Sequence, residues 1–313
     1  MSVILPILQA ATGLSERDLR AIIANAPSRY KNYSIPKRNG GLRMISQPAK
    51  EVKSLQRALS DSVLSALPVH SSAMAYRPGL SIFHNAARHA RNGPILKFDF
   101  VDFFPSIKAT DWVAYCKRNS LFHDEEDILI STRILFRRAR RGHILRLAIG
   151  APSSPHLSNV LMHDFDKQIC DRVLGDKVTY TRYADDLTFS AKRTGYFKDV
   201  EYHLRAVIRE IRSPSLRLNA KKTVSATMKY RRIVTGLVLA NDHTVSLGHE
   251  RKRRISSAVN HARYGKLSRE EIVKLAGTLA FVSDIEPTFL DRLKRKYGDE
   301  LINEIKYSTS AGS

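Results

Sequence analysis

The chain has 313 residues, with 52 Lys and Arg against 30 Asp and Glu, so its formal net charge is +22. Hydrophobic residues make up 43% of the sequence, which excludes a wholly disordered chain, and no apolar run approaches the ~18 residues that a membrane helix requires. A globular protein this basic is expected to bind a polyanion, first of all nucleic acid, although a solvated basic surface without such a partner is the plain alternative.

The N-terminal third is predicted to be helical around one β-hairpin. Ser15 is a suitable N-cap for a helix over ERDLRAIIANA, and residues 50–67 have the pattern of a second helix. Between these helices, Tyr33–Pro36 and Leu42–Ser46 flank the turn residues Asn39–Gly41, and together these segments predict a hairpin.

The middle of the chain is predicted to mix short strands with amphipathic helices. Lys177–Arg182 and Leu187–Ala191 alternate with period two around Tyr183–Asp186, which predicts a β-hairpin with two carboxylates at its tip. The other elements predicted here are a strand over Ile95–Phe100, helices over 124–141 and 196–212, a helix from Pro155 to Leu174 with Ser154 as N-cap, and strands over Arg231–Ala240 and Thr244–Leu247.

The C-terminal part is predicted to be a small helical unit. It begins at Gly248, contains the capping box Ser268–Glu271, and ends in STSAGS, whose residues are expected to be frayed. The expected fold class is therefore α+β, with an antiparallel sheet in the middle of the chain. Basic residues gather in three zones, near Arg133–Arg146, Arg205–Arg232 and Arg251–Lys266, which favours a charged groove over a detachable basic arm.

Acidic residues at predicted strand ends are the most informative feature of this basic chain. Asp99 stands where the apolar strand should continue, a costly position unless the carboxylate is paired or binds a metal. Asp185 and Asp186 would by themselves be ordinary turn formers. Two strands that each bring carboxylates to one sheet edge can instead hold two Mg²⁺ ions, whose bridging to phosphates suits nucleotidyl transfer on nucleic acid.

Five segments, in order along the chain, resemble the motif series of reverse transcriptases. They are KFDFVDFFPSI, GAPSSP, YADD, LNAKKT and IVTGLVLA, and the upstream segment IPKRNGGLRMISQP extends the resemblance. Two further segments, NAARH at Asn85–His89 and VTG at Val234–Gly236, resemble those that mark bacterial retron reverse transcriptases. The resemblance implies a right-hand polymerase with N-terminal helices and fingers over 1–94, a palm over 95–240 with fingers elements near 110–150, and a helical, RNA-binding thumb over 241–313.

The retron resemblance also implies a particular reaction and particular partners. An enzyme of this kind uses dNTPs to copy part of its cognate structured non-coding RNA into single-stranded DNA (msDNA), primed from a 2′-hydroxyl of the same RNA, which gives an RNA–DNA product. It acts in antiphage defence beside an effector protein. Cys116 and Cys170 are too few to staple the chain, and the N-terminus lacks a signal peptide, so a cytoplasmic protein with no membrane partner is expected.

Catalytic roles follow from the same resemblance. Asp99, Asp185 and Asp186 would be the triad that holds two Mg²⁺ ions, and the backbone carbonyl of Phe100 would complete the metal shell. Lys222 would be the general acid that protonates the leaving pyrophosphate, although its neighbour Lys221 fits the motif equally well.

Nucleotide-binding roles are implied around this triad. Phe104 matches the aromatic steric gate against ribonucleotides, with core packing as its plain alternative. Ile149 stands where the family often has Gln, which removes a polar contact to the nucleotide. The residues implied to bind the nucleotide are Lys37 and Arg43 (otherwise a solvated hairpin face), Asp102 (otherwise a helix cap), Phe104, Gly150 and Ala151.

RNA-binding roles are implied for the two retron-like segments and the basic C-terminal helices. Asn85 and His89 lie four residues apart on a predicted helix, so they share a face and either contact RNA or form a structural network. The residues implied to bind RNA are Asn85, His89, Val234, Thr235, Gly236, Arg251, Arg253 and Arg254.

Two other interpretations stay open on the sequence alone. A non-retron reverse transcriptase, of the group II intron-like or abortive-infection type, would share the chemistry but not the priming. A catalytically decayed polymerase that only binds RNA would share the fold, but it would keep the three aspartates at a cost in stability.

Overall fold

The computed structural model describes residues 2–37, 40–139 and 142–308, and these divide into two compact units. Unit 1 comprises Met1–Gly79 and Leu96–Ser225, and unit 2 comprises Leu80–Ile95 and Ala226–Ser313. Both units combine helices with antiparallel strands, as the predicted α+β class requires. Asn39 of the predicted turn, Arg140 and Arg141 of the first basic zone, and the tail after Ser308 lie outside the described residues.

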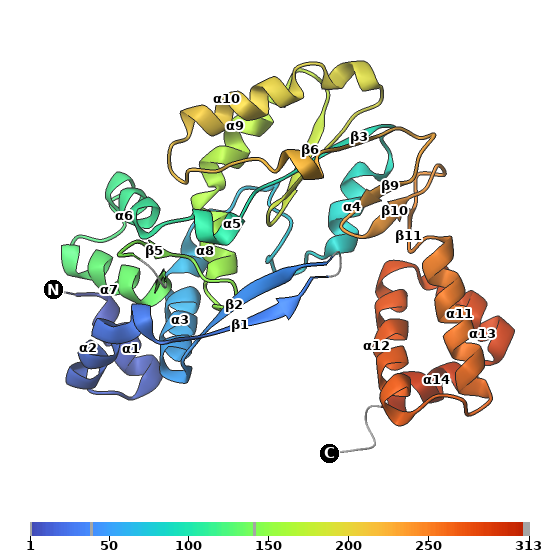
Figure 1. The fold of residues 1–313 in the computed structure, drawn as a ribbon, viewed down its shortest axis with the longest axis horizontal. Coiled ribbons are helices and arrows are strands. Elements are labelled where there is room, and N and C mark those ends of the chain that lie inside the picture. Colours follow the sequence, from blue (N-terminus) through green and yellow to red (C-terminus); the bar gives the residue numbers. More distant parts are fainter. Residues whose placement is uncertain (1, 38–39, 140–141, 309–313) are drawn as a thin grey trace. The chain divides into compact units, whose positions relative to one another are not determined.

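Unit 1 begins with helices and the predicted hairpin (Figure 1). The Ser15 hydroxyl accepts a hydrogen bond from the Asp18 backbone N–H at 3.2 Å, which confirms this residue as the N-cap of the second helix. Two strands then pair antiparallel with Tyr30 opposite Pro48. The elements are α1 (Ile4–Thr12), α2 (Glu16–Asn25), η1 (Ala26–Ser28), β1 (Tyr30–Pro36), β2 (Leu42–Pro48), α3 (Lys50–Ser62) and η2 (Leu64–Ala66).

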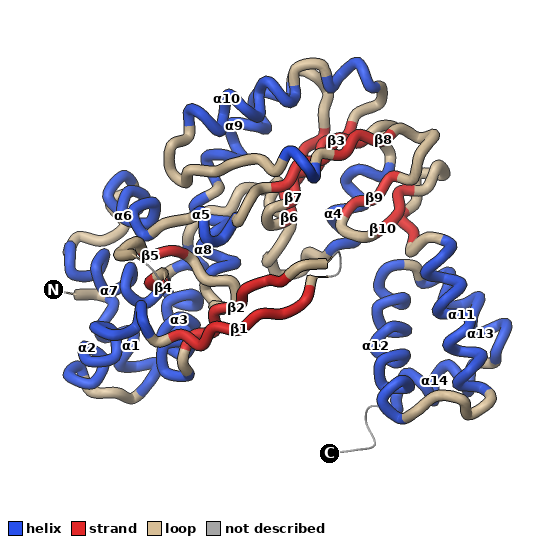
Figure 2. The backbone as a smooth tube through the Cα atoms, viewed as in Figure 1, coloured by secondary structure: helices blue, strands red, loops and turns tan. Residues whose placement is uncertain are grey.

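A four-stranded sheet forms the centre of unit 1 (Figure 2). Its strand order is β6 (Thr179–Tyr183), β7 (Asp186–Ser190), β3 (Ile95–Asp99) and β8 (Val224–Ala226). Tyr183 pairs with Asp186, so the β6–β7 hairpin turns over Ala184 and Asp185 and carries its carboxylates at the tip, as predicted. Because β3 lies next to β7, the end of β3 brings Asp99 beside that tip.

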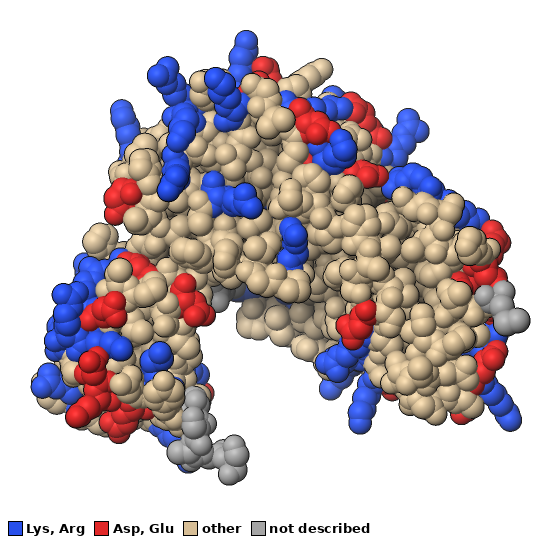
Figure 3. Space-filling view, turned by 180° about the vertical axis from the view of Figure 1, so that it is seen from behind, with Lys and Arg blue, Asp and Glu red and all other residues tan. Residues whose placement is uncertain are grey.

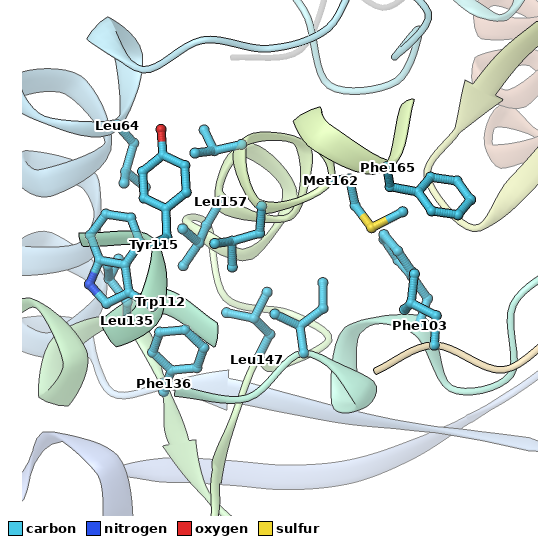
Figure 4. Packing of buried hydrophobic residues seen from close by; sticks show 14 of the residues in the cluster. Leu64, Phe103, Trp112, Tyr115, Leu135, Phe136, Leu147, Leu157, Met162 and Phe165 are labelled. Carbon is cyan, nitrogen blue, oxygen red and sulfur yellow. The ribbon is translucent and has the colours of Figure 1, made fainter. Parts of the chain in front are cut away.

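Packing beneath the sheet determines which way Asp99 faces. Phe98 and Phe100 on either side of it are both buried, and Phe100 stacks on Phe103 with ring centroids 5.9 Å apart. Side chains alternate along a strand, so burial of the two phenylalanines turns Asp99 to the opposite face. Figure 4 shows the adjoining core, with Phe103 beside Met162 and Phe165.

Helices of unit 1 cover this core. Helix α9 (His163–Leu174) packs against β6, and α10 (Val200–Glu210) packs against α9 (Figure 1). The remaining helices and turns of unit 1 are α5 (Phe103–Ser106), α6 (Ala109–Arg118), α7 (Glu125–Leu135), α8 (Ser154–Leu161), α9 (His163–Leu174), η3 (Thr194–Phe197), α10 (Val200–Glu210) and η4 (Ala220–Lys222).

Two predicted helices of unit 1 differ from the structure. The helix expected over 124–141 ends at Leu135, because Phe136 is extended and fully buried, and Arg137 then pairs with Arg146 between β4 (Arg137–Arg138) and β5 (Leu145–Arg146). The helix expected to Leu174 is broken at Met162, which is also fully buried, and its N-cap is Ser153 rather than the adjacent serine. Burial in the core overrides local helix propensity at both places.

Unit 2 contains helices around a three-stranded sheet. Ser268 and Glu271 form the predicted capping box, with the Ser268 backbone N–H donating to Glu271 Oε2 at 2.8 Å. The elements are α4 (Ile82–Ala90), β9 (Arg232–Val234), β10 (Leu237–Leu239), β11 (Val245–Ser246), α11 (His249–Arg263), α12 (Arg269–Ile285), α13 (Pro287–Tyr297) and α14 (Asp299–Tyr307). No helix among the described residues of either unit is long and apolar enough to cross a membrane.

The single strand predicted over Arg231–Ala240 is instead a tight hairpin. Val234 pairs with Leu237, and the two turn residues, Thr235 and Gly236, have φ values of 47° and 79°. Positive φ at both central positions is typical of a type I′ turn, which matches the twist of the strands it joins. The division into fingers, palm and thumb is one of function and stays a prediction, whereas the compact unit 2 joins α4 to the chain after Ser225.

Candidate active site

Three predicted carboxylates meet at the ends of β3 and β7. The Phe100 backbone N–H donates to the Asp185 carbonyl at 3.2 Å, which ties the end of β3 to the hairpin tip. In the tip itself Ala184, immediately before Asp185, has a left-handed φ of 57°. Asp99 lies more than 80 positions before Asp185 and Asp186 in the sequence, and strand pairing brings it beside them.

Electrostatic coupling shows how close these groups are. Burial, together with repulsion from Asp186 and Asp99, raises the pKa of Asp185 to about 6. Burial also raises the pKa of Asp186, against the attraction of Lys97, and Asp99 adds to the rise. A cation placed among the three carboxylates would relieve this repulsion.

Lys222 is the basic partner of the triad. Its ammonium Nζ donates to Asp99 Oδ2 at 2.8 Å, and this bond raises the pKa of the lysine. Asn219 adds a bond from its backbone N–H to the Asp99 carbonyl at 2.7 Å. The contact distinguishes Lys222 from Lys221, which does not line the cavity beside Asp99.

A cavity of about 440 Å³ opens beside the carboxylates. It combines the predicted triphosphate ligands with the predicted sugar gate, while the neighbouring cavity of about 370 Å³ is lined by Gly150 and Ala151. The titratable residues that line the larger cavity are Lys37, Arg43, Arg137 and Lys222 among the cations, and Asp99, Asp102 and Asp185 among the carboxylates, with Tyr76 beside them. Asp186 does not line it.

Phe104 and Asp102 lie at the edge of this cavity. The Phe104 ring is half-buried, packs 5.3 Å from the Phe103 ring and lines both cavities, so it is partly core and partly cavity wall. Asp102 precedes α5 with a φ of 47°, and its side chain makes no capping hydrogen bond. The position of Asp102 in the cavity therefore favours the nucleotide interpretation over the helix cap.

Gly150 is required by a close approach of two backbone segments. Its φ is +114°, and a Cβ there would lie 2.9 Å from Ile45 Cγ2 and 3.2 Å from the Ser46 carbonyl oxygen. The Ser46 backbone N–H donates to the Ile149 carbonyl at 2.8 Å. A glycine at this position lets the GAPSSP segment pack directly on β2.

Two titratable residues of the cavity were not predicted from the sequence as site residues. Arg137 lay in the first basic zone but on a predicted helix, whereas it belongs to β4, and its buried Nε has no hydrogen-bond partner among the described residues. Tyr76 carries no motif, and only its left-handed φ of 60°, which a sequence does not reveal, distinguishes it.

The predicted RNA-binding residues of unit 2 divide into buried and exposed sets. Asn85, His89 and Val234 are all buried, so their side chains cannot contact RNA directly. For Asn85 and His89, burial favours the alternative of a structural network. The Thr235 hydroxyl donates to the Ile82 carbonyl at 3.0 Å, which joins the β9–β10 turn to α4. Among the exposed set in α11, Arg251 lies 4.5 Å over the Phe281 ring, Arg254 pairs with Glu250, and Arg253 is exposed.

The three carboxylates are the type of ligand that a divalent cation prefers, although their side chains are not arranged as a coordination shell. Within the described residues, no three His, Cys, Asp or Glu side chains form a group arranged to hold a metal ion. The Lys222 ammonium instead neutralises Asp99. Three mutually repelling oxygen donors at one sheet edge are nonetheless the ligand type that hard cations such as Mg²⁺ prefer.

Comparison with known proteins identifies the family. Residues 35–255 match the family model described as reverse transcriptase (RNA-dependent DNA polymerase). The Retron Ec83 reverse transcriptase of Escherichia coli is 35% identical over 298 residues, which cover 94% of this chain and 96% of that protein. The chain belongs to the retron reverse transcriptases.

Further relatives agree with this assignment. This retron reverse transcriptase is also 32% identical to the Retron Ec73 enzyme over 291 residues (89% of this chain, 90% of that protein) and 32% identical to the Retron Ec86 enzyme over 308 residues (96% and 92%), both of Escherichia coli. It is therefore an RNA-directed DNA polymerase, a nucleotidyltransferase with the right-hand polymerase fold of its family, and the predictions of family, enzyme class and fold class are confirmed.

Proposed function

We propose that this reverse transcriptase copies part of a cognate structured non-coding RNA into msDNA, primed from a 2′-hydroxyl of that RNA, and that the carboxylate site carries the transfer. The observation that carries the proposal is the meeting of Asp99 and Asp185 with four cations in one cavity of about 440 Å³. Cations suit a triphosphate, and paired carboxylates suit the metal ions that accompany it.

We assign the metal-binding role to Asp99, Asp185 and Asp186, with the Phe100 carbonyl as a further oxygen donor. When bound there, two Mg²⁺ ions would supply the charge that activates the attacking hydroxyl and balances the leaving pyrophosphate. Asp99 is buried and Asp185 and Asp186 are half-buried, and this partial loss of contact with water strengthens their attraction for a cation. The three side chains therefore position the reacting groups and set the local charge.

The remaining cavity residues would bind and orient the nucleotide. Lys37 and Arg43 lie on the β1–β2 hairpin and would bind the triphosphate, the guanidinium by paired hydrogen bonds and the ammonium as a point charge. The Lys222 Nζ carries a proton that it donates to Asp99 in a hydrogen bond, and its place beside the triad would let it donate a proton to the leaving pyrophosphate. Phe104 would exclude the ribose 2′-hydroxyl by steric clash.

The biological setting follows from the family. We propose that the enzyme is cytoplasmic and acts in antiphage defence with an effector protein, and the two free thiols, Cys116 and Cys170, suit a reducing compartment. The turn at Thr235–Gly236, whose glycine is exposed, and Arg251, Arg253 and Arg254 of α11 would bind the structured RNA. The alternative of a decayed polymerase gains no support from a site that keeps all three carboxylates.

The nucleic acid that co-purifies with the chain tests this proposal. We expect one RNA species joined to single-stranded DNA through a 2′,5′ linkage, so that ribonuclease leaves DNA carrying a short branched RNA remnant. The Asp185→Asn variant should carry the same RNA without the DNA. Linear DNA with an ordinary 3′,5′ junction would support a non-retron type of priming instead.

A further inference from the structure

Tyr76 has an unusual backbone conformation beside the catalytic carboxylates. Its φ of 60° lies in the left-handed region, which is rare for a bulky aromatic residue and unfavourable. The side chain is 45% exposed, yet burial of the hydroxyl end and the charge of Asp185 both raise its pKa. An exposed aromatic ring in a strained conformation at a reaction site suggests that its position matters for function.

A buried network holds the Tyr76 segment in this conformation. The Asn159 side-chain amide donates to the Ala75 carbonyl at 2.8 Å, and Asn159 Oδ1 accepts from Arg182 Nη1 at 3.1 Å. Arg182 also pairs with Asp166 at 2.6 Å, and both side chains of this pair are fully buried. A buried, fully paired arginine has one arrangement, so it can fix the neighbouring backbone.

The same arginine joins the Tyr76 segment to the catalytic hairpin. The Met74 backbone N–H donates to the Arg182 carbonyl at 2.8 Å, and the Arg182 backbone N–H donates to the Ser72 carbonyl at 2.8 Å. Arg182 Nη1 reaches the Ala184 carbonyl at 3.3 Å in the hairpin turn. One buried side chain therefore sets the position of Tyr76 relative to Asp185.

Tyr76 lies on the boundary between two cavities of different chemistry. The cavity of about 440 Å³ is lined by the carboxylates and the cationic side chains. The cavity of about 370 Å³ is lined mainly by apolar residues and by the segment Gly150–Pro155. Tyr76, Phe104 and Ile149 line both cavities, and the Tyr76 and Phe104 ring centroids are 6.3 Å apart. A nucleotide has the same division, with a charged triphosphate at one end, a flat base at the other, and the sugar between them.

We propose that the Tyr76 ring packs against the incoming nucleotide where its sugar joins its base, and so forms a second selective wall of the site beside Phe104. This inference rests on the nucleotide-binding role proposed for the larger cavity. The ring provides the contact surface, so phenylalanine should replace tyrosine. Asn159 is a positioning residue, because it acts on the nucleotide through Tyr76.

Single-nucleotide incorporation on an RNA template with a separate DNA primer tests the role of the ring. Tyr76→Ala should raise KM for the dNTP about tenfold, the loss typical of a removed aromatic–base contact, with kcat little changed and discrimination against rNTPs reduced. Tyr76→Phe should match the wild type. The control, Tyr202→Ala, truncates a 66% exposed tyrosine on α10 and should change neither KM nor kcat.

Clear results would overturn the inference. It fails if Tyr76→Ala keeps the wild-type KM and discrimination, or if Tyr76→Phe loses as much as Tyr76→Ala, because the hydroxyl rather than the ring would then make the contact. Since the primer is supplied, failure of 2′-hydroxyl priming would leave this assay unaffected, and the two proposals fail separately.

A double-variant comparison tests the positioning role. Asn159→Ala should raise KM in the wild-type background but not in the Tyr76→Ala background, because the ring it positions is already gone. A purely structural loss would add equally in both backgrounds. Additive effects on KM would therefore contradict the positioning role of Asn159.

Discussion

Asp185 is a half-buried carboxyl group whose folded-state pKa, about 6, lies above its ordinary value of 3.8. Below pH 3.8 the group is protonated in both the folded and the unfolded chain, so its raised pKa costs no stability there. As the pH rises from 3.8 through about 6 the free energy of unfolding falls, because the unfolded chain ionises this carboxyl freely while the folded chain must ionise it in a partly buried place beside two other carboxylates. Asp185 therefore opposes folding at neutral pH when no cation is bound.

We expect Asp185→Asn to stabilise the metal-free enzyme at pH 8 by up to about 3 kcal/mol and to have little effect near pH 4, as a pKa difference of about two implies. Urea unfolding in EDTA at both pH values measures this difference. Asp61→Asn, an exposed change on α3, is the control and should be neutral at both. An equal effect of Asp185→Asn at the two pH values would contradict the raised pKa.

Phe104 provides a second prediction for a single residue. Phe104→Val should admit ribonucleotides, because the shorter side chain no longer clashes with a 2′-hydroxyl, whereas Phe103→Val should mainly destabilise the core in which Phe103 is buried. The ratio of kcat/KM for dNTPs and rNTPs measures the effect. Unchanged discrimination in a folded Phe104→Val enzyme would assign this ring to the core alone.

Candidate site residues could be predicted from the sequence where they belong to a short motif. They could not be predicted where their position depends on packing against distant parts of the chain. Asp99, Asp185, Asp186 and Lys222 belong to segments with recognisable patterns, and strand pairing brings them together. The role proposed for Tyr76 depends instead on a left-handed φ and on the bond that Asn159, 83 positions away, donates to the neighbouring Ala75 carbonyl, and no local pattern encodes that contact.

The segment around Gly150 shows how one element constrains another. We expect Gly150→Ala to destabilise the enzyme by about 1–3 kcal/mol, because the new Cβ meets Ile45 in β2 and the φ suits only glycine. Gly175→Ala is the matched control, since its φ is −61° and a Cβ there meets nothing within 4 Å. Thermal unfolding of both variants provides the comparison, and equal Tm values would contradict the close packing of Gly150 on β2.

Elements were predictable from periodicity, but their ends depended on the core. The β6–β7 hairpin and the α12 capping box were confirmed because turn and cap residues act locally. The helix expected over 124–141 ended early because Phe136 is buried, and the strand over Arg231–Ala240 became a hairpin at Thr235–Gly236. Each of these differences depends on contacts between residues far apart in the sequence.

Charge acts at the scale of the whole molecule. Figure 3 shows Lys and Arg side chains distributed over the visible face rather than gathered in one patch. With a net charge of +22, non-specific affinity for RNA should be high and should fall steeply with salt. To select a cognate RNA, the enzyme needs contacts that depend on RNA shape as well as this non-specific attraction.

We expect Arg253→Ala combined with Arg254→Ala to weaken binding of the co-purified RNA and of an unrelated hairpin alike, with a smaller salt slope. Changes at Thr235 and Gly236 should mainly reduce the preference between the two RNAs, because Gly236 is exposed and Thr235 joins this turn to α4. Titrations of each variant with both RNAs at two salt concentrations separate the effects. A wild-type enzyme without any preference would contradict selective RNA binding.

Incorporation of dNTPs on a primed RNA template is the most direct test that Asp99, Asp185 and Asp186 form the polymerase site. The wild-type enzyme should extend the primer with Mg²⁺, stop when EDTA is added, and resume when Mg²⁺ is restored. The Asp186→Asn enzyme should fold and bind RNA normally, yet its rate of dNTP incorporation should fall by about a thousandfold. A loss of this size is typical when one charged or polar group that stabilises the transition state is removed. Asp61→Asn should keep full activity. Wild-type rates of incorporation by Asp186→Asn, or incorporation by the wild type in EDTA, would contradict the assignment.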